Sequence, residues 1–444
     1  MKTLNLAFLF LASSAFATEV IFEKDNSFPI VYINAAFTVG AVHDPLDQSG
    51  QAYLLCQMIL RGTATKTKTQ IEEYLDQLGA RLDCETRAES IVFRGAVLTG
   101  QFSSFSEIFL DLLSHPSFPQ AELIKLKSEV TSRILEQQGK DNSLAKRHFD
   151  SWFFGQHPYA KPVIGKLKTI PNITSESLKS AFDKWMHAGT LLIVATGDIE
   201  QSQIENFARQ VVKNRPKKES PPSIDVPQVA QKQRVQFIDK PDRSQTQINV
   251  GQLGIKLNDS KYHALYLANH AFGGGSFSAR MMTEVRVKRG WSYGAYSYFK
   301  DASQPKLWQY YLFPASKDTL QALKLTLEMT KEFQKSGITE AEFESAKRSL
   351  VNNAGFNFNT PLKRVENTLS EHLLGLPEGF WKDFGEKLND LSHSEVNNAV
   401  SSFIKPDQLA ISVLGTASQL KSGVAKTLGI DEKEIQTVSY SEDP

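Results

Sequence analysis

The chain repeats itself, and this duplication constrains its fold more than any other feature. Residues 174–197 contain a Thr-Ser-Glu-Ser-Leu start and a later Leu-Leu-Ile-Val-Ala run, and residues 392–415 follow the same order. A second match relates residues 118–127 to residues 338–347. Both matches are offset by about 220 residues, as two copies of one structural unit would be. The sequence therefore predicts two halves built alike.

Each half has the mixture of strands and helices typical of an α+β fold. Residues 30–39 alternate and are rich in β-branched side chains, which predicts a strand. Residues 69–78 and 105–113 have the apolar spacing of amphipathic helices, and residues 191–195 form an apolar run suited to a buried strand. Because strands and helices do not alternate strictly, each half is expected to be an α/β roll, a mixed sheet packed by helices.

Composition sets the boundaries of the halves. The stretch after residue 211 is rich in Lys, Pro, Ser and Gln, which is typical of a linker. We therefore expect an N-terminal half at residues 18–211, a linker at 212–235, a C-terminal half at 236–432 and a tail at 433–444.

The first residues have the pattern of a secretory signal peptide. Lys2 precedes an apolar run at residues 4–12, and Ala15-Phe16-Ala17 forms a small-residue cleavage site. We expect residues 1–17 to be removed and the mature chain to be exported, to the bacterial periplasm in the simplest case. An uncleaved anchor and a eukaryotic secretory origin are the alternatives, although the apolar run is short for a bilayer span.

Charge and cysteine content exclude several functional classes. The chain has 50 Lys and Arg against 49 Asp and Glu, so no strong net field attracts nucleic acid or anionic lipid. The basic segment at residues 213–218 is interpreted as the solvated face of the linker. Two cysteines, Cys56 and Cys84, are too few for a disulfide scaffold.

One helix resembles a metal-binding helix whose ligands have been replaced. Residues 50–63 read Gly-Gln-Ala-Tyr-Leu-Leu-Cys-Gln-Met-Ile-Leu-Arg-Gly-Thr. This frame resembles the Gly-x-Ala-His-x-x-Glu-His-Met-x-x-x-Gly-Thr segment of the pitrilysin/insulysin superfamily of zinc peptidases. Residues 157–165 and 79–86 are similar to two further stretches of that superfamily. The resemblance implies two α/β rolls that form one side of a clamshell closing around an extended peptide.

The residues at the superfamily's metal-binding and catalytic positions cannot bind zinc in this chain. The resemblance places the two zinc-binding His at Tyr53 and Gln57 and the general base at Cys56, and the third ligand, a Glu, at Ile134. A phenol, a thiol, an amide and an alkyl group cannot hold zinc and activate its water. We expect no metal or other cofactor in this chain. The resemblance also brings Cys56 and Cys84 to the same cleft, either as a disulfide or as two small buried residues.

The second half keeps a different motif. Gly273, Gly274, Gly275 and Ser276 form a flexible loop with amides suited to a peptide main chain, and Arg286 and Tyr293 follow it. The superfamily has an Arg and a Tyr at this place and spacing, which reach the zinc centre when the clamshell closes. There Tyr donates to the oxyanion and Arg binds a substrate carbonyl oxygen. The alternative is a surface Arg and a core Tyr beside a turn.

These features resemble the two-chain branch of the superfamily, which includes mitochondrial processing peptidase. The resemblance implies the non-catalytic subunit of a heterodimeric zinc endopeptidase, inactive alone. Its partner would hold the zinc, and extended peptides would be the substrates. The alternatives are a peptide-binding or chaperone-like clamshell, or an architectural subunit whose cleft is unused.

Overall fold

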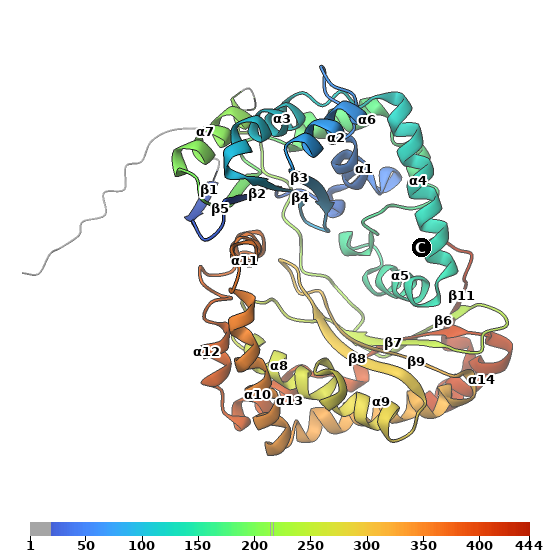
Figure 1. Ribbon diagram of the computed structural model, residues 1–444. Coiled ribbons are helices and arrows are strands. Elements are labelled where there is room, and N and C mark those ends of the chain that lie inside the picture. The colour runs from blue at the N-terminus through green and yellow to red at the C-terminus, as the bar shows by residue number, and fades with distance from the viewer. Residues whose placement is uncertain (1–18, 214, 216) are drawn as a thin grey trace, which may run out of the picture.

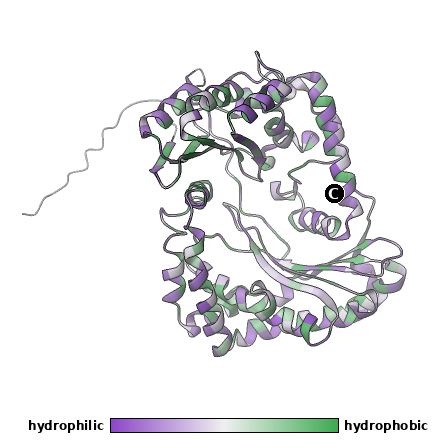
Figure 2. Ribbon diagram, in the orientation of Figure 1, coloured by the Kyte–Doolittle hydropathy of each residue, from purple (hydrophilic) through white to green (hydrophobic). Residues whose placement is uncertain are grey.

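The computed structural model describes residues 19–213, 215 and 217–444. The expected signal peptide lies outside the described residues. Figure 1 shows two sheet-and-helix halves stacked one above the other, each with helices on its outer side. The long helices on the outside mix hydrophilic and hydrophobic residues, as helices with one buried stripe do (Figure 2).

The N-terminal half contains a five-stranded sheet in the order β1-β5-β2-β4-β3. Its strands are β1 (Glu19–Lys24), β2 (Ile30–Phe37), β3 (Arg81–Thr86), β4 (Ile91–Leu98) and β5 (Leu191–Gly197). Strand β1 runs parallel to β5, and the other neighbours are antiparallel. Strand β3 is therefore an edge of this sheet.

The C-terminal half repeats this order and adds one strand. Its sheet has the order β11-β6-β10-β7-β9-β8. The strands are β6 (Arg234–Asp239), β7 (Gln247–Gln252), β8 (Ser292–Lys300), β9 (Leu307–Pro314), β10 (Ala410–Gly415) and β11 (Ile435–Ser439). Strands β6 to β10 occupy the places of β1 to β5, so the predicted pair of similar mixed sheets is confirmed.

Helices cover the outer face of each sheet and enclose a separate core. The N-terminal helices are α1 (Gln51–Ile59), α2 (Lys68–Gln77), α3 (Phe102–Ser114), α4 (Gln120–Gly139), α5 (Asp141–Phe154), α6 (Ser175–Trp185) and α7 (Gln201–Val212). The C-terminal helices are α8 (Tyr262–Asn269), α9 (Thr319–Ser336), α10 (Glu340–Ala354), α11 (Pro361–Leu374), α12 (Phe384–Asn389), α13 (His393–Phe403) and α14 (Ala417–Leu428). Thr174 and Ser392 cap the equivalent helices α6 and α13. The repeated sequence thus encodes the same helix start twice.

The halves exchange one helix each, which ties them together. Helix α5 lies beside β7 of the other half (Figure 1). It also contacts β10, where Leu144 packs near Leu414. Helix α11 lies against β2 and β5, where Leu369 packs near Val194. Because α5 and α11 are equivalent in the repeat, the contact is reciprocal. Each half thus covers part of the sheet of the other half with one helix.

Ion pairs accompany both exchanged helices. Arg94 of β4 donates to Glu366 of α11 at 2.7 Å, and Lys240 donates to Asp141 at the start of α5 at 2.7 Å. Arg364 of α11 also bonds Glu23 of β1 at 2.9 Å. These contacts join segments far apart in the sequence, so they fix how the halves sit relative to each other.

The expected tail at residues 433–444 is instead part of the fold. Strand β11 pairs in parallel with β6 and forms an edge of the C-terminal sheet. Beyond it, the carboxylate of Asp443 forms an ion pair with Arg147 of α5 and accepts a hydrogen bond from the Leu167 amide. Both charged side chains are nearly buried. The segment is short and polar, which suggested a tail, but it completes a sheet and a buried ion pair.

Acid is expected to destabilise the chain through His148, which lies beside this ion pair on α5. Burial lowers the pKa of the His148 imidazole to about 4, although nearby Glu442 and Asp443 act in the opposite direction. The unfolded histidine takes up a proton below about pH 6.5, whereas the native one stays neutral. Stability should therefore fall by about 3 kcal/mol as the pH falls from about 6.5 to 4.

Urea unfolding of wild type and of His148→Gln at pH 7 and at pH 4.5 measures this effect. The variant, which cannot titrate at this position, should lose less stability than wild type. Equal losses in both proteins would show that His148 does not cause the acid sensitivity.

Candidate functional site

The former zinc helix α1 is anchored at its start by a buried carboxylate. Asp44 accepts hydrogen bonds from the amides of Gly50 at 2.7 Å and Ala52 at 2.8 Å. Gly50 has φ of +100°, and a Cβ there would lie 2.9 Å from the Cα of Gly165. The glycine and the aspartate thus fix the backbone at the amino end of α1.

Every replaced position on and near α1 is engaged in a structural contact. The Tyr53 hydroxyl accepts from Arg133 at 2.7 Å, and the Gln57 amide donates to the Cys84 carbonyl at 3.0 Å. Cys56 forms a disulfide with Cys84, which resolves the alternative left open by the sequence. Ile134 is fully buried in the core. These contacts fasten α1 to the edge strand β3 and to helix α4, and none of the four side chains is left to form a zinc-binding set.

The acids near Ile134 do not replace the missing ligand. Glu129 pairs with Arg61 at 2.6 Å, and Glu136 pairs with Lys140 at 2.6 Å. Within residues 19–213, 215 and 217–444, no cluster of three or more His, Cys, Asp or Glu side chains is arranged to hold a metal ion. The donor set at the superfamily's zinc position therefore does not fit zinc.

The disulfide is expected to stabilise this half strongly. It closes a loop with a sequence separation of 28 residues, for which chain entropy gives about 3 to 4 kcal/mol. The double variant Cys56→Ala/Cys84→Ala should lose about this much in urea unfolding. Reductant should destabilise wild type by a similar amount and leave the variant unchanged. Two free thiols in non-reduced tryptic peptides of the purified protein would contradict this prediction.

The structure brings Arg286 and Tyr293 together on the surface of the C-terminal half. The Arg286 guanidinium lies 4.0 Å from the centre of the Tyr293 ring and 4.7 Å from that of Phe277. Tyr293 is 72% exposed, so it is not the core tyrosine of the alternative interpretation. Both side chains offer hydrogen-bond donors to a molecule outside this chain. Their role in catalysis stays a prediction.

The glycine-rich loop is packed more tightly than its sequence suggests. A Cβ at Gly273 would lie 2.7 Å from the Ser297 amide nitrogen, and one at Gly275 would lie 2.7 Å from the His270 carbonyl. Gly273 is buried, whereas Gly274 and Ser276 are exposed. Ser276 has φ of +54°. The glycines at 273 and 275 therefore allow close approach to neighbouring backbone, and the exposed backbone is at Gly274 and Ser276.

A cavity of about 430 Å³ lies beside this loop, and the sequence did not reveal it. It lies between the inner face of the C-terminal sheet and the first turns of α5. Its lining comprises Asn142, Ser143, Lys146, Gln247, Asn249, Gly273, Gly274, Tyr296, Ser297, Tyr298, Gln309 and Tyr311. The sequence did contain a pattern that indicates it: polar or aromatic side chains recur two residues apart on β7, β8 and β9. This spacing places the side chains of each strand on one face of the sheet.

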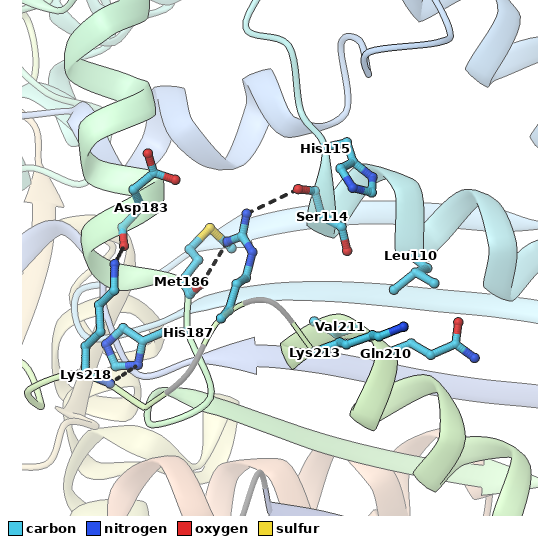
Figure 3. A pocket seen from close by; sticks show the side chains of 11 residues that line it. Leu110, Ser114, His115, Asp183, Met186, His187, Gln210, Val211, Lys213 and Lys218 are labelled. Atoms are coloured by element: carbon cyan, nitrogen blue, oxygen red, sulfur yellow. Dashed lines mark hydrogen bonds between the residues drawn. The ribbon is translucent and has the colours of Figure 1, made fainter. Parts of the chain in front are cut away.

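The basic segment after α7 is exposed at Lys213, Lys217 and Lys218, as the sequence interpretation expects, but Arg215 is packed against the fold. Arg215 donates to the carbonyls of Met186 and Ser114 at 2.8 and 3.3 Å, and its guanidinium lies 3.7 Å from the centre of the Phe182 ring. Burial lowers the pKa of Arg215 to about 10. Figure 3 shows Lys218 bonded to the carbonyl of Asp183 on α6. These cations satisfy the carboxyl ends of α3 and α6, where carbonyls lack helical partners.

Comparison with known proteins agrees with this geometry. Residues 19–166 match the family described as insulinase (peptidase family M16), and residues 172–350 match the peptidase M16 inactive domain. A non-peptidase homolog, YmxG, from Helicobacter pylori is 23% identical over 405 residues, covering 90% of this chain and 93% of that protein. An uncharacterized zinc protease from Rickettsia felis is 27% identical over 326 residues, covering 73% and 77%.

A solved structure has the same architecture. The crystal structure of a peptidase M16 inactive domain from Pseudomonas fluorescens has a TM-score of 0.85 at 28% identity, covering 91% of this chain and 96% of that one. The fold and the replaced zinc positions define a duplicated α/β-roll protein of inactive type. The chain belongs to peptidase family M16, so the resemblance to the pitrilysin/insulysin superfamily is confirmed. Among the described residues, no helix has the length and apolar character to cross a membrane.

Proposed function

We propose that this chain is the non-catalytic subunit of a heterodimeric zinc endopeptidase. Its catalytic partner, a second M16 chain with an intact His-x-x-Glu-His helix, supplies the zinc and the general base. This chain supplies half of the substrate chamber together with Arg286 and Tyr293. The substrates are extended peptides, and the chain does not hydrolyse them alone.

The exposed Arg286–Tyr293 pair is the observation that carries this proposal. The Tyr293 ring stacks on the Arg286 guanidinium and projects into solvent. This exposure leaves both the ring and the hydroxyl of Tyr293 accessible to another molecule. A developing oxyanion on a zinc-bound peptide is the group that two such donors stabilise best. In this chain, the zinc positions are filled by a disulfide and a buried isoleucine, so the electrophile must come from a partner.

We also infer that the protein works outside the cytoplasm, in the periplasm of a bacterium. The amino-terminal residues have the signal-peptide pattern described above. A disulfide between Cys56 and Cys84 favours the same assignment, because such bonds persist in oxidising compartments and are rare in the cytosol.

Titration of a catalytic M16 chain with this protein tests the proposal. The catalytic chain should come from the same genome and should be assayed with a fluorogenic peptide. The cleavage rate should rise and saturate at one equivalent of this chain. A matched titration with the variant Arg286→Gln should give less activity at the same saturation point. An unchanged rate across the titration would contradict the proposal and would favour a peptide-binding or architectural role.

A further inference from the structure

The cavity beside the glycine-rich loop has a floor of buried amides. Gln247 and Asn249 lie two residues apart on β7, and Gln309 lies on β9; all are at most 9% exposed. Tyr311 pairs with Asn249 across the β7–β9 ladder and with Tyr296 across the β8–β9 ladder. These residues therefore share one face of the sheet. Buried amides at the base of an open cavity can fix the orientation of a ligand through specific hydrogen bonds.

One of these amides lacks a partner for its oxygen. The Gln309 nitrogen donates to the Asn249 oxygen at 3.0 Å, but the Gln309 Oε1 atom, on a side chain only 1% exposed, accepts no hydrogen bond from any described residue. A buried acceptor left without a donor is unfavourable, because nothing compensates the loss of its hydration. Gln309 lines the cavity, so an N–H group of a ligand that displaces its neighbours there would supply the missing donor.

The opposite wall of the cavity is electropositive. Lys146 is the one charged side chain in the lining, and it forms no ion pair with the described residues. The acids on its helix are already engaged, since Asp141 bonds Lys240 at 2.7 Å and Asp150 pairs with Lys300. Asn142 and Ser143 place the first turn of α5, a helix of 14 residues, on the same wall. The amino end of a helix and a free ammonium group both favour an anion.

Tyrosine rings form the remaining wall. The Tyr296 and Tyr311 ring centres are 5.5 Å apart, and those of Tyr298 and Tyr311 are 6.0 Å apart. Such rings pack against apolar side chains and can donate hydrogen bonds through their hydroxyls. The cavity therefore combines an acceptor, a cation and an aromatic surface.

We propose that this cavity binds a carboxylate-bearing end of a peptide. The carboxylate lies against Lys146 and the first turn of α5, a peptide N–H donates to Gln309 Oε1, and a side chain packs on the tyrosines. A carboxyl terminus offers the N–H and the carboxylate next to each other, whereas an α-ammonium group would be repelled by Lys146. This assignment rests on the proposed function, because it names the part of the peptide substrate that this subunit binds.

Fluorescence anisotropy with the isolated wild-type chain tests the assignment. The probes are three rhodamine-labelled nonapeptides of Ala, Gly and Phe: one with a free carboxyl terminus, one with a terminal carboxamide, and one carboxamide carrying a penultimate Glu. The free acid should bind about tenfold or more tightly than the plain carboxamide, as expected for a hydrogen-bonded charge. Tight binding of the Glu peptide would show that the cavity also accepts the carboxylate of a Glu side chain.

Variants locate the binding site. Lys146→Gln should remove the preference for the carboxylate, whereas the matched control Lys331→Gln on the outer helix α9 should keep it. Gln309→Leu should weaken binding of the free acid without changing the midpoint of thermal unfolding by more than the control does. Equal binding of acid and carboxamide, absence of binding, or a preference retained in Lys146→Gln would overturn the assignment. The binding assay contains no partner chain. Such a result would therefore not decide whether this chain stimulates peptide cleavage, which the titration with a catalytic M16 chain tests separately.

Discussion

Replacement of Tyr293 by Phe in the assembled two-chain complex is expected to lower kcat about a hundredfold or more and to leave the zinc content unchanged. Tyr293 is exposed at the surface of this chain, and its ring lies beside the Arg286 guanidinium. Loss of one preorganised donor to an oxyanion costs about 2.7–4 kcal/mol in the barrier. Since Phe keeps the ring that stacks on Arg286, the fold and the assembly should be preserved.

Steady-state cleavage of a fluorogenic peptide and metal analysis of the same samples measure this effect. The matched control is Tyr440→Phe, which removes a hydroxyl from another exposed tyrosine. The control should retain wild-type turnover. If Tyr293→Phe cleaves at the wild-type rate in a complex with full zinc occupancy, Tyr293 does not act in the transition state.

Asp443→Asn is expected to lower the free energy of unfolding by about 3–5 kcal/mol. The change leaves the Arg147 guanidinium buried without its counter-charge, with only 6% of the side chain exposed. Removal of one partner of a buried pair is costly because the other charge stays desolvated. The same residue holds the end of the chain to the Leu167 amide.

Urea unfolding measures this loss, and Asp407→Asn provides a matched control. Asp407 is exposed and forms no ion pair with the described residues, so its replacement should change the stability by less than about 0.5 kcal/mol. Equal stability of the two variants would mean that the Arg147–Asp443 pair is not important for holding the chain end.

The architecture of each half could be predicted because its signals are local and occur twice. Thr174 and Ser392 cap equivalent helices, and the apolar run at residues 191–195 lies within the fully buried strand β5. Two copies of one pattern imply two copies of one sheet order. The resemblance to a known frame added which positions of α1 correspond to the metal-binding positions of the superfamily.

The remaining features depend on contacts between segments far apart in the sequence. Nothing local to α5 or α11 indicates that each packs on the other half, and residues 433–444 are too polar to suggest an edge strand and a buried ion pair. The cavity was missed for the same reason, since Lys146 and Gln309 line one cavity only because α5 crosses to the second sheet.

The structure at the degenerate zinc positions could also be predicted only in part from the sequence. The motif positions indicated which groups were absent, but the contacts that replaced them follow from the three-dimensional arrangement. Gln57 bonds the Cys84 carbonyl, and Arg133 bonds Tyr53, because α1, β3 and α4 converge there. The residues at these positions therefore have a structural role: they join helix α1 to the edge strand β3 and to helix α4.

Metal content and peptide cleavage of the purified chain alone test the central claim most directly. The account predicts less than a tenth of an equivalent of zinc and no cleavage, with both gained when the catalytic M16 chain is added. One tightly bound zinc ion per molecule, together with hydrolysis by the solitary chain, would contradict it.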